Sequence, residues 1–392
     1  MLNLPMTVIL LGLTSFWTDA GSEMIFPLLP MFLTGALGAS PAFLGLVEGT
    51  ADLVASVLKL YAGRLSDRLG MRKPLVMGGY GLASLVRPLV AFATAPWHVL
   101  VVRVTDRVGK GVRGAPRDAL IADAAVDGQS ARAFAFHRAM DHSGAVVGPL
   151  VAAGLLAYGM PLRTVFLCAA VPGILAFATT TLVKEQAPPA APAKEVTAGT
   201  SAPVALPRPF WGLLGVLAVF GLGNSSDAFL LLRAKTLGVE DAHIPLLWSF
   251  FHVSKVGFSA VGGWIGDKLP RRYAIVAGWA VYAVVYLLFG LATSSWQMWA
   301  LFAVYGIYFG LCEPVEKALV RDVVPVALRG SAFGWYNFVT GAMALPASVL
   351  IGAVWATWGP MPALATGSGL AGLAVLGILA LSPMLKAAGS TG

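Results

Sequence analysis

Twelve apolar segments, each about as long as a membrane-spanning helix, follow one another along this chain of 392 residues. A helix needs roughly 20 apolar residues to cross the hydrocarbon core of a bilayer. Six segments precede a polar stretch in the middle of the chain, at 6–33, 42–65, 75–93, 97–122, 133–158 and 162–183. The other six follow it, at 210–232, 245–265, 274–292, 296–320, 331–355 and 361–385. We therefore expect an all-α integral membrane protein with twelve transmembrane helices.

The composition and the first segment agree with this interpretation. Only 12% of the residues are charged, roughly half the fraction found in soluble domains. The first segment contains Asp19 and Glu23 and follows no basic residues, whereas a signal peptide has a basic start and an apolar middle. We interpret it as a retained helix. Cys168 and Cys312 stand alone in different segments, which predicts neither a disulfide framework nor a metal site, and no cofactor is expected.

Lys and Arg residues predict how the chain is oriented in the membrane. Positive residues beside spans are retained on the cytoplasmic side. They cluster after 42–65, in 184–209, after 245–265 and between 296–320 and 331–355, and they are sparse in the alternate loops. Both termini are therefore expected in the cytoplasm and the chain in a bacterial-type inner membrane. The net charge of +8 reflects this topology, so we expect no nucleic-acid partner.

The chain is internally duplicated. Residues 184–209 are rich in Ala and Pro and predict a linker between an N-terminal bundle, 1–183, and a C-terminal bundle, 210–392. The run Gly63-Arg-Leu-Ser-Asp67-Arg68-Leu-Gly-Met-Arg72 recurs after the linker as Gly263-Trp-Ile-Gly-Asp267-Lys-Leu-Pro-Arg-Arg272. Two pseudo-symmetric six-helix bundles suit alternating access, in which one bundle rocks against the other around a site near the midplane.

These repeated loops resemble the signature loops of the major facilitator superfamily, and the resemblance covers essentially the whole chain. A carboxylate beside guanidinium groups at a helix end can make charge-assisted hydrogen bonds in one conformation and break them in another. The alternative is that the basic residues only anchor the topology. The residues expected to act as a gate in these loops are Asp67, Arg68, Arg72, Asp267 and Arg272.

The segment 97–122 contains far more charge than an apolar environment tolerates, because an unpaired charge at the bilayer centre costs a few kcal/mol. It reads Arg103-Val-Thr-Asp106-Arg107-Val-Gly109-Lys110. The resemblance implies that this segment lines a cavity and that Arg103 contributes to proton coupling, although Arg107 stands where glycine is usual. We expect Arg107 and Lys110 to bind a negatively charged solute; alternatively, they neutralise nearby carboxylates.

Ionisable residues in the first half are paired at helical spacing, which places both members on one helix face. Such pairs in a poorly hydrated cavity allow proton exchange near neutral pH. The predicted proton sites are Asp19, Glu23, Glu48 and Asp52.

His137 and Asp141 show the same spacing and open the possibility of a metal site, although pairing with Arg138 or Arg87 is favoured. No metal is predicted. The residues expected to contact the solute, besides Arg107 and Lys110, are Asp19, Glu23, His137, Asp141, Asp227, Tyr336 and Asn337.

The run Gly144-Ala-Val-Val-Gly148-Pro149 resembles a motif associated with antiporters in the same superfamily. Small residues at this spacing also let two helices pack closely, so Gly148 and Pro149 serve either gating or packing. The hypothesis we favour is a monomeric, proton-coupled exporter of a small polar or anionic solute. The alternative is an importer of an organic anion or of a metal chelated by one. A membrane-embedded enzyme is disfavoured because no nucleophile motif accompanies the histidines.

Overall fold

The computed structural model describes residues 4–69, 71–124, 130–185, 206–268, 270–324 and 328–389. Within these ranges the chain forms helices and turns and contains no β-strand. The prediction of an all-α chain is confirmed for this part of the protein. Each of the twelve predicted segments coincides with one helix or with consecutive helices, with ends that differ by a few residues.

Eleven helical elements lie in the described residues of the first half. α1 (Met6–Ile25) continues through η1 (Phe26–Leu28), α2 (Leu29–Met31) and η2 (Phe32–Ala36). The long helices that follow are α3 (Pro41–Leu69), α4 (Lys73–Val86), which extends into η3 (Arg87–Phe92), α5 (Pro96–Ala124) and α6 (Ser130–Ala157). α7 (Leu162–Cys168) and α8 (Ala170–Leu182) complete this half as two consecutive pieces of one predicted segment.

The second half contains α9 (Arg208–Gly223), α10 (Ala228–Thr236), α11 (His243–Lys268), α12 (Arg271–Leu291), α13 (Ser295–Val323), α14 (Arg329–Trp358) and α15 (Pro360–Gly389). The expectation of one continuous helix over 210–232 is wrong, because the chain leaves the helix between α9 and α10. Tyr282 donates a hydrogen bond to the carbonyl of Gly223 at 3.0 Å, and Tyr286 donates one to the carbonyl of Ser225 at 3.4 Å. These phenols satisfy carbonyls that the interrupted helix leaves without partners.

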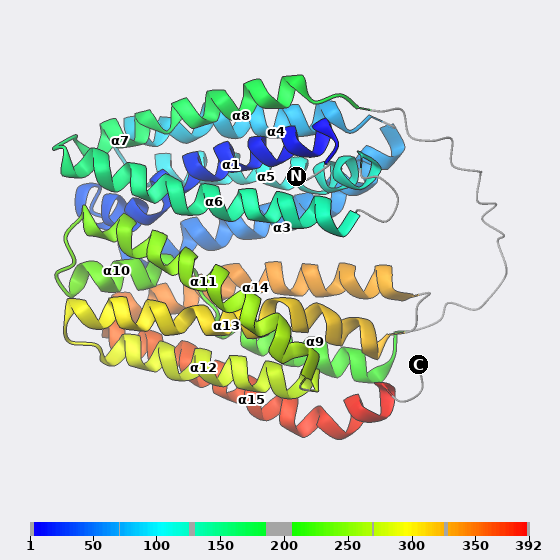
Figure 1. Ribbon diagram of the computed structural model, residues 1–392. Helices are drawn as coiled ribbons and strands as arrows, with labels where there is room; N and C mark the ends of the chain where they lie inside the picture. The colour runs from blue at the N-terminus through cyan, green and yellow to red at the C-terminus, as the bar shows by residue number, and fades with distance from the viewer. Residues whose placement is uncertain are drawn as a thin grey trace.

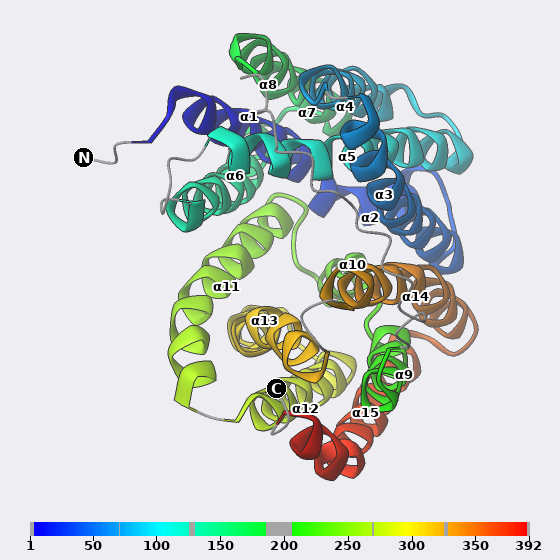
Figure 2. The same ribbon diagram turned by 90° about the vertical axis from the view of Figure 1, so that its right-hand side faces the viewer.

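The helices form two groups that correspond to the two halves of the sequence (Figure 1). Across the boundary, α3 packs along α14 and α6 packs along α11. The first contact depends on small residues, because a Cβ atom at Gly45 would lie 2.0 Å from the carbonyl oxygen of Ser348. Seen along the helix axes, the two groups lie on either side of a central region that α11 and α14 border from the second half (Figure 2).

The two ends of the molecule differ. At one end, here called the linker end, Thr7 donates a hydrogen bond to the carbonyl of Lys184 at 3.2 Å, so the start of α1 lies beside the last described residues before 206. At the opposite end, α10 packs against α2, η1 and α3. Leu28 and Phe32 there share one buried apolar cluster with Phe229 and Leu231. The halves are thus joined by apolar contacts at the opposite end.

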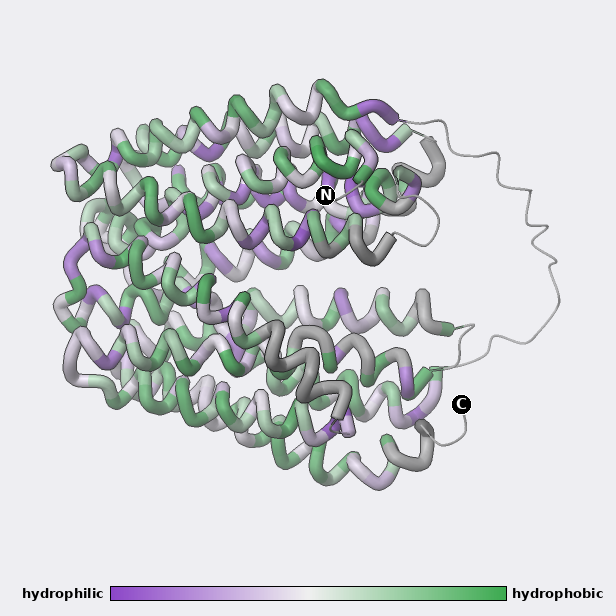
Figure 3. Tube along the Cα trace, in the orientation of Figure 1, coloured by the Kyte–Doolittle hydropathy of each residue, from purple (hydrophilic) through white to green (hydrophobic). Residues whose placement is uncertain are grey.

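Eight of the described helical stretches are long and apolar enough to cross a membrane. The charge-bearing helices α1, α5, α11 and α13 are not among them. Figure 3 shows the same pattern as hydrophilic stretches within helices as well as at their ends. Because buried charge is costly in lipid, these four helices require a polar region inside the molecule.

Candidate functional site

Two adjoining cavities lie between the halves. The first has a volume of about 470 Å³ and the second about 760 Å³. Both are lined by α1, α3 and α5 from the first half and by α11 and α14 from the second. Glu23, Asp52, His252, Thr340 and Ala344 line both cavities, so the two volumes form one continuous site.

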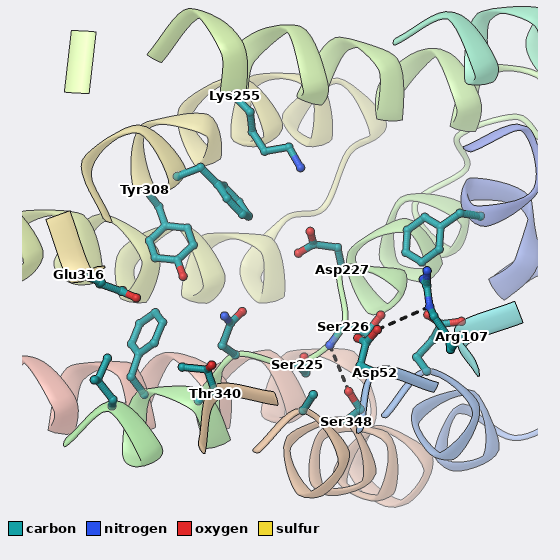
Figure 4. Close-up of a pocket in the computed structure, with 18 of the residues that line it drawn as sticks. Asp52, Arg107, Ser225, Ser226, Asp227, Lys255, Tyr308, Glu316, Thr340 and Ser348 are labelled. Carbon is teal, nitrogen blue, oxygen red and sulfur yellow. Dashed lines mark hydrogen bonds and ion pairs between the residues drawn. The ribbon is translucent and has the colours of Figure 1, made fainter. Parts of the chain in front are cut away.

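The break between α9 and α10 forms part of the first cavity. Asn224, Ser225, Ser226 and Asp227 all line it, and Figure 4 shows Asp227 directed into the open space that Lys255 and Tyr308 also face. The backbone N–H of Ser226 donates to the hydroxyl of Ser348 at 3.2 Å. The break therefore contributes both polar side chains and backbone groups to the cavity wall.

Two carboxylates of the second half are oriented by aromatic donors. Asp227 Oδ1 accepts a hydrogen bond from the hydroxyl of Tyr305 at 3.0 Å. Glu316 accepts one from the indole of Trp279 and one from the hydroxyl of Tyr336, each at 3.0 Å. The predicted residues Asp227 and Tyr336 both line the first cavity, and so does Glu316, to which Tyr336 is hydrogen-bonded.

Arg107 faces the first cavity from the other side. Its Nε lies 3.7 Å from Asp52 Oδ1, and its Nη1 lies 3.9 Å from Asp106 Oδ2. Both separations are too long for hydrogen bonds, and Nε has no hydrogen-bond partner among the described residues. The side chain is 10% exposed and lines the first cavity, so a largely buried guanidinium forms part of the wall of a solute-sized space.

The second cavity is lined by one face of α5. Lys110, Arg113 and Arg117 lie on it at spacings of three and four residues. Lys110 forms no ion pair or hydrogen bond with another described side chain. Arg113 stacks on Tyr80, with its guanidinium carbon 4.4 Å from the ring centre. The remaining charged residues of this cavity are Asp19, Glu23, Asp52, Lys59, Arg138 and Asp141.

Behind this wall lie two buried ion pairs. Arg103 binds Glu48 through two hydrogen bonds of 3.0 and 2.7 Å, and both side chains are at most 5% exposed. Arg87 donates to Asp106 at 2.8 Å. Arg103 does not line either cavity, although Glu48 reaches the first. Of the two expected partners for the His137 and Asp141 cluster, Arg87 is wrong, because this first residue of η3 binds Asp106 of α5 instead.

His137 is buried and lines neither cavity, whereas Asp141 lines the second. Their nearest charged atoms lie 3.6 Å apart, and Ser15 of α1 donates a hydrogen bond to Asp141. Within the described residues, no group of three or more His, Cys, Asp or Glu residues is placed to hold a metal ion. A role for His137 in solute binding stays a prediction.

The candidate gate residues lie near the linker end. The side chains of Asp67, Arg68 and Asp267 lie outside the described part of the structure. Arg72 forms an ion pair with Asp123, and its backbone N–H donates to Glu185 at 2.6 Å. In the second half Asp322 pairs with Arg271, whereas Arg272, the repeat counterpart of Arg72, stacks on Tyr273 with 4.8 Å between guanidinium carbon and ring centre.

Gly148 and Pro149 lie on α6 and line neither cavity. A Cβ at Gly148 would lie 2.2 Å from the carbonyl oxygen of Ala20, and one at Gly144 would lie 2.3 Å from that of Phe16. These glycines therefore allow α6 to pack closely on α1. Asn337 lines the second cavity and donates to the carbonyl of Phe333 at 2.8 Å.

One inter-half contact was missed in the sequence. The indole of Trp248 on α11 donates to Glu23 Oε2 on α1 at 2.7 Å. His252 follows on the same face, and neither of its ring nitrogens has a hydrogen-bond partner in the described part of the chain. The spacing of Trp248, His252 and Lys255 at i, i+4 and i+7 is the signal that could have identified this polar face.

Comparisons with known proteins agree with this architecture. Residues 11–348 match the family model described as Major Facilitator Superfamily. An uncharacterised MFS-type transporter of Methanocaldococcus jannaschii is 32% identical over 360 residues, which cover 90% of this chain and 89% of that protein. The multidrug resistance protein MdtH of Photorhabdus laumondii is 29% identical over 138 residues, covering 35% of this chain and 34% of that protein.

Solved structures share the fold at low identity. The nucleoside transporter NupG, as a mutant, superposes with a TM-score of 0.78 at 15% identity, covering 96% of this chain and 99% of that one. A peptide transporter, POT, superposes with a TM-score of 0.80 at 14% identity, covering 99% and 96%. The resemblance seen in the repeated loops is confirmed: the chain belongs to the Major Facilitator Superfamily, whose members are multi-pass membrane transporters.

Proposed function

We propose that this protein is a secondary active transporter that exports a small polar or anionic solute in exchange for protons by alternating access. The observation that supports this best is the continuous pair of cavities between the halves, with Arg107 and Lys110 on one wall. A guanidinium and an ammonium in a poorly hydrated cavity favour a negatively charged group on the solute.

In the proposed arrangement, all twelve segments cross the inner membrane, and residues 1–183 and 210–392 move as two bundles around the site. The basic loops and both termini are then cytoplasmic. In this proposal the conformation faces the cytoplasm, because the halves are joined at the opposite end, where α10 packs against α2, η1 and α3. The protein acts as a monomer, because each half supplies a different wall of one site.

Asp19, Glu23 and Asp52 carry the protons in this proposal. All three line the second cavity, and two of them also line the first, so water and solute reach the carboxylates together. Glu23 has a further property: its carboxylate accepts the indole N–H of Trp248 from the other half. Protonation weakens a hydrogen bond to a carboxylate, so loading a proton there loosens a contact between the halves.

Export is favoured by two observations. The Gly144 to Pro149 run resembles an antiporter motif, and about a third of the chain resembles a protein named for multidrug resistance. Export would deliver the solute from the cytoplasmic face to the opposite side while protons return.

The test uses purified protein reconstituted into liposomes with an imposed pH gradient. Anionic and polar solutes should move against their gradients only when the proton gradient runs in the opposite direction. The Asp19→Asn and Glu23→Gln variants should still exchange solute for solute while losing the response to the pH gradient. Solute movement by the unaltered protein that ignores the gradient would refute the coupling.

A further inference from the structure

The two cavities differ in charge. Five carboxylates line the first, against the two cations Arg107 and Lys255. Five cations line the second, against four carboxylates. We infer that the transported solute is a zwitterion with an aromatic or similar apolar body, whose amine lies in the first cavity and whose anionic group lies in the second. This inference rests on the proposed function, and it specifies the class of solute.

The amine end is defined by Asp227 and the rings around it. Asp227 stands at the break between α9 and α10, where Tyr305 fixes one carboxylate oxygen. Phe220, Tyr308 and Phe309 line the same cavity. An ammonium already packs on this aromatic wall, since Lys255 Nζ lies 4.7 Å from the centre of the Phe309 ring. Ring faces and a carboxylate together suit a solute amine.

The anionic end is defined by Lys110 and Arg113. The two side chains are three residues apart on α5 and both line the second cavity; Arg107, three residues before Lys110, lies beside Asp52, which lines both cavities, and so borders this end. Arg113 is 4% exposed and stacks on Tyr80, and within the described residues it forms no ion pair with a carboxylate. A buried guanidinium without a paired anion is unfavourable, so a carboxylate or similar group on the solute would supply the missing charge.

A zwitterion satisfies both ends at once. A solute with only an anionic group leaves the carboxylates of the first cavity facing its apolar body, and a solute with only an amine leaves Lys110 and Arg113 unmatched. The zwitterion also touches α5 of the first half and the α9–α10 break of the second. Its binding therefore draws the two halves together, as closure around a solute requires.

The test measures binding of matched compounds to the purified full-length protein by isothermal titration. Each set shares one body that carries its charges at opposite ends: 4-(aminomethyl)phenylacetate, 4-methylbenzylamine and 4-methylphenylacetate form the first set, with corresponding biphenyl and hexyl sets that change the separation of the charges. In at least one set the zwitterion should bind at least about tenfold more tightly than either singly charged analogue, a difference typical of one added charge contact.

Two variants locate the ends. Asp227→Asn should remove the protein's preference for the zwitterion over the anionic analogue. Lys110→Gln should remove the protein's preference for the zwitterion over the amine analogue. Asp241→Asn, which alters an exposed ion pair with Lys235, is the control and should change neither ratio.

The inference is overturned if no zwitterion binds more tightly than its analogues, or if the two variants leave both ratios unchanged. Proton-driven transport of a simple anion in liposomes would then leave the proposed function intact while removing this inference. Preferential binding of a zwitterion without any proton-driven transport would instead support this inference and refute the proposed proton coupling.

Discussion

The two walls of the central site use different chemistry. The wall from the first half is backed by buried guanidinium–carboxylate pairs, Arg103 with Glu48 and Arg87 with Asp106. The wall from the second half holds Asp227 and Glu316 with phenol and indole donors. Ion pairs are strong, oriented and costly to break, whereas single hydrogen bonds from aromatic side chains are weaker. The first half is therefore expected to be the rigid, charge-recognising partner, and the second half the more adaptable one.

The largest effect on stability is expected when one of the buried ion pairs of the first half is broken. Glu48→Gln leaves Arg103 buried without its anion and should lower the free energy of unfolding by about 3–5 kcal/mol. Denaturant titration in detergent measures this change. The matched Tyr305→Phe variant removes one hydrogen bond to a carboxylate in the other wall and should cost less, about 1.5–3 kcal/mol. The double variant Arg103→Met with Glu48→Leu should recover most of the loss. Equal losses for Glu48→Gln and Tyr305→Phe would contradict the difference between the walls.

The second prediction concerns the contact that joins the walls. Trp248→Phe keeps an aromatic ring but removes the N–H that binds Glu23, a hydrogen bond to a charged group worth about 1.5–3 kcal/mol. The fraction of molecules in which the two halves are separated at the opposite end should therefore rise at least about tenfold. Pulsed electron resonance between spin labels at Ser40→Cys and Asp241→Cys, with Cys168 and Cys312 replaced by Ala, measures it. Trp335→Phe, on an exposed face of α14, is the control. An unchanged distance distribution in Trp248→Phe would remove this link from the mechanism.

The third prediction sharpens the role of charge on the first wall. Arg107→Gln should raise the KM for a solute that carries an anionic group about tenfold, equivalent to about 1.4 kcal/mol. The maximal transport rate should stay nearly constant. Lys235→Gln, which changes an exposed cation outside both cavities, should leave KM within twofold of the original. Initial rates in liposomes over a range of solute concentrations distinguish these results. A fall in the maximal rate at constant KM would instead assign Arg107 to the conformational step.

The smallest effect is expected for Asn337 on the second wall. Its side-chain amide bonds to the carbonyl of Phe333 in its own helix, and the residue is exposed. Asn337→Ala should change stability by no more than about 0.5 kcal/mol. Thermal unfolding and a transport assay on the same preparation measure both properties. A large loss of transport with normal stability would show that Asn337 contacts the solute directly.

Much of the candidate site could be predicted from spacing alone. Asp19, Glu23, Asp52, Arg107 and Lys110 all line the cavities, because charge within an apolar segment has to face a polar region. Arg103 and His137 carry the same signal but lie behind the wall. Helical periodicity predicts on which face of its own helix a residue lies, but it does not predict which neighbouring helix packs against that face.

The contributions of the second half were harder to predict. Trp248 and Glu316 depend on partners far away in the chain, Glu23 and Trp279 respectively. The break after Gly223 depends on phenols of α12, which no local propensity contains. Weak helix formers at 221–227 hinted at it, but tertiary contacts decided where the helix stops.

The sequence by itself determined the apolar segments, the duplicated halves, the family signature and the helices that carry charge. These properties follow from desolvation cost and local periodicity, which each segment expresses independently of the others. Only the tertiary structure decided which charges pair, which remain available to a solute and how both halves form one cavity. Those outcomes depend on how α3 packs on α14 and α6 on α11, and such packing is set by contacts between residues far apart in the chain.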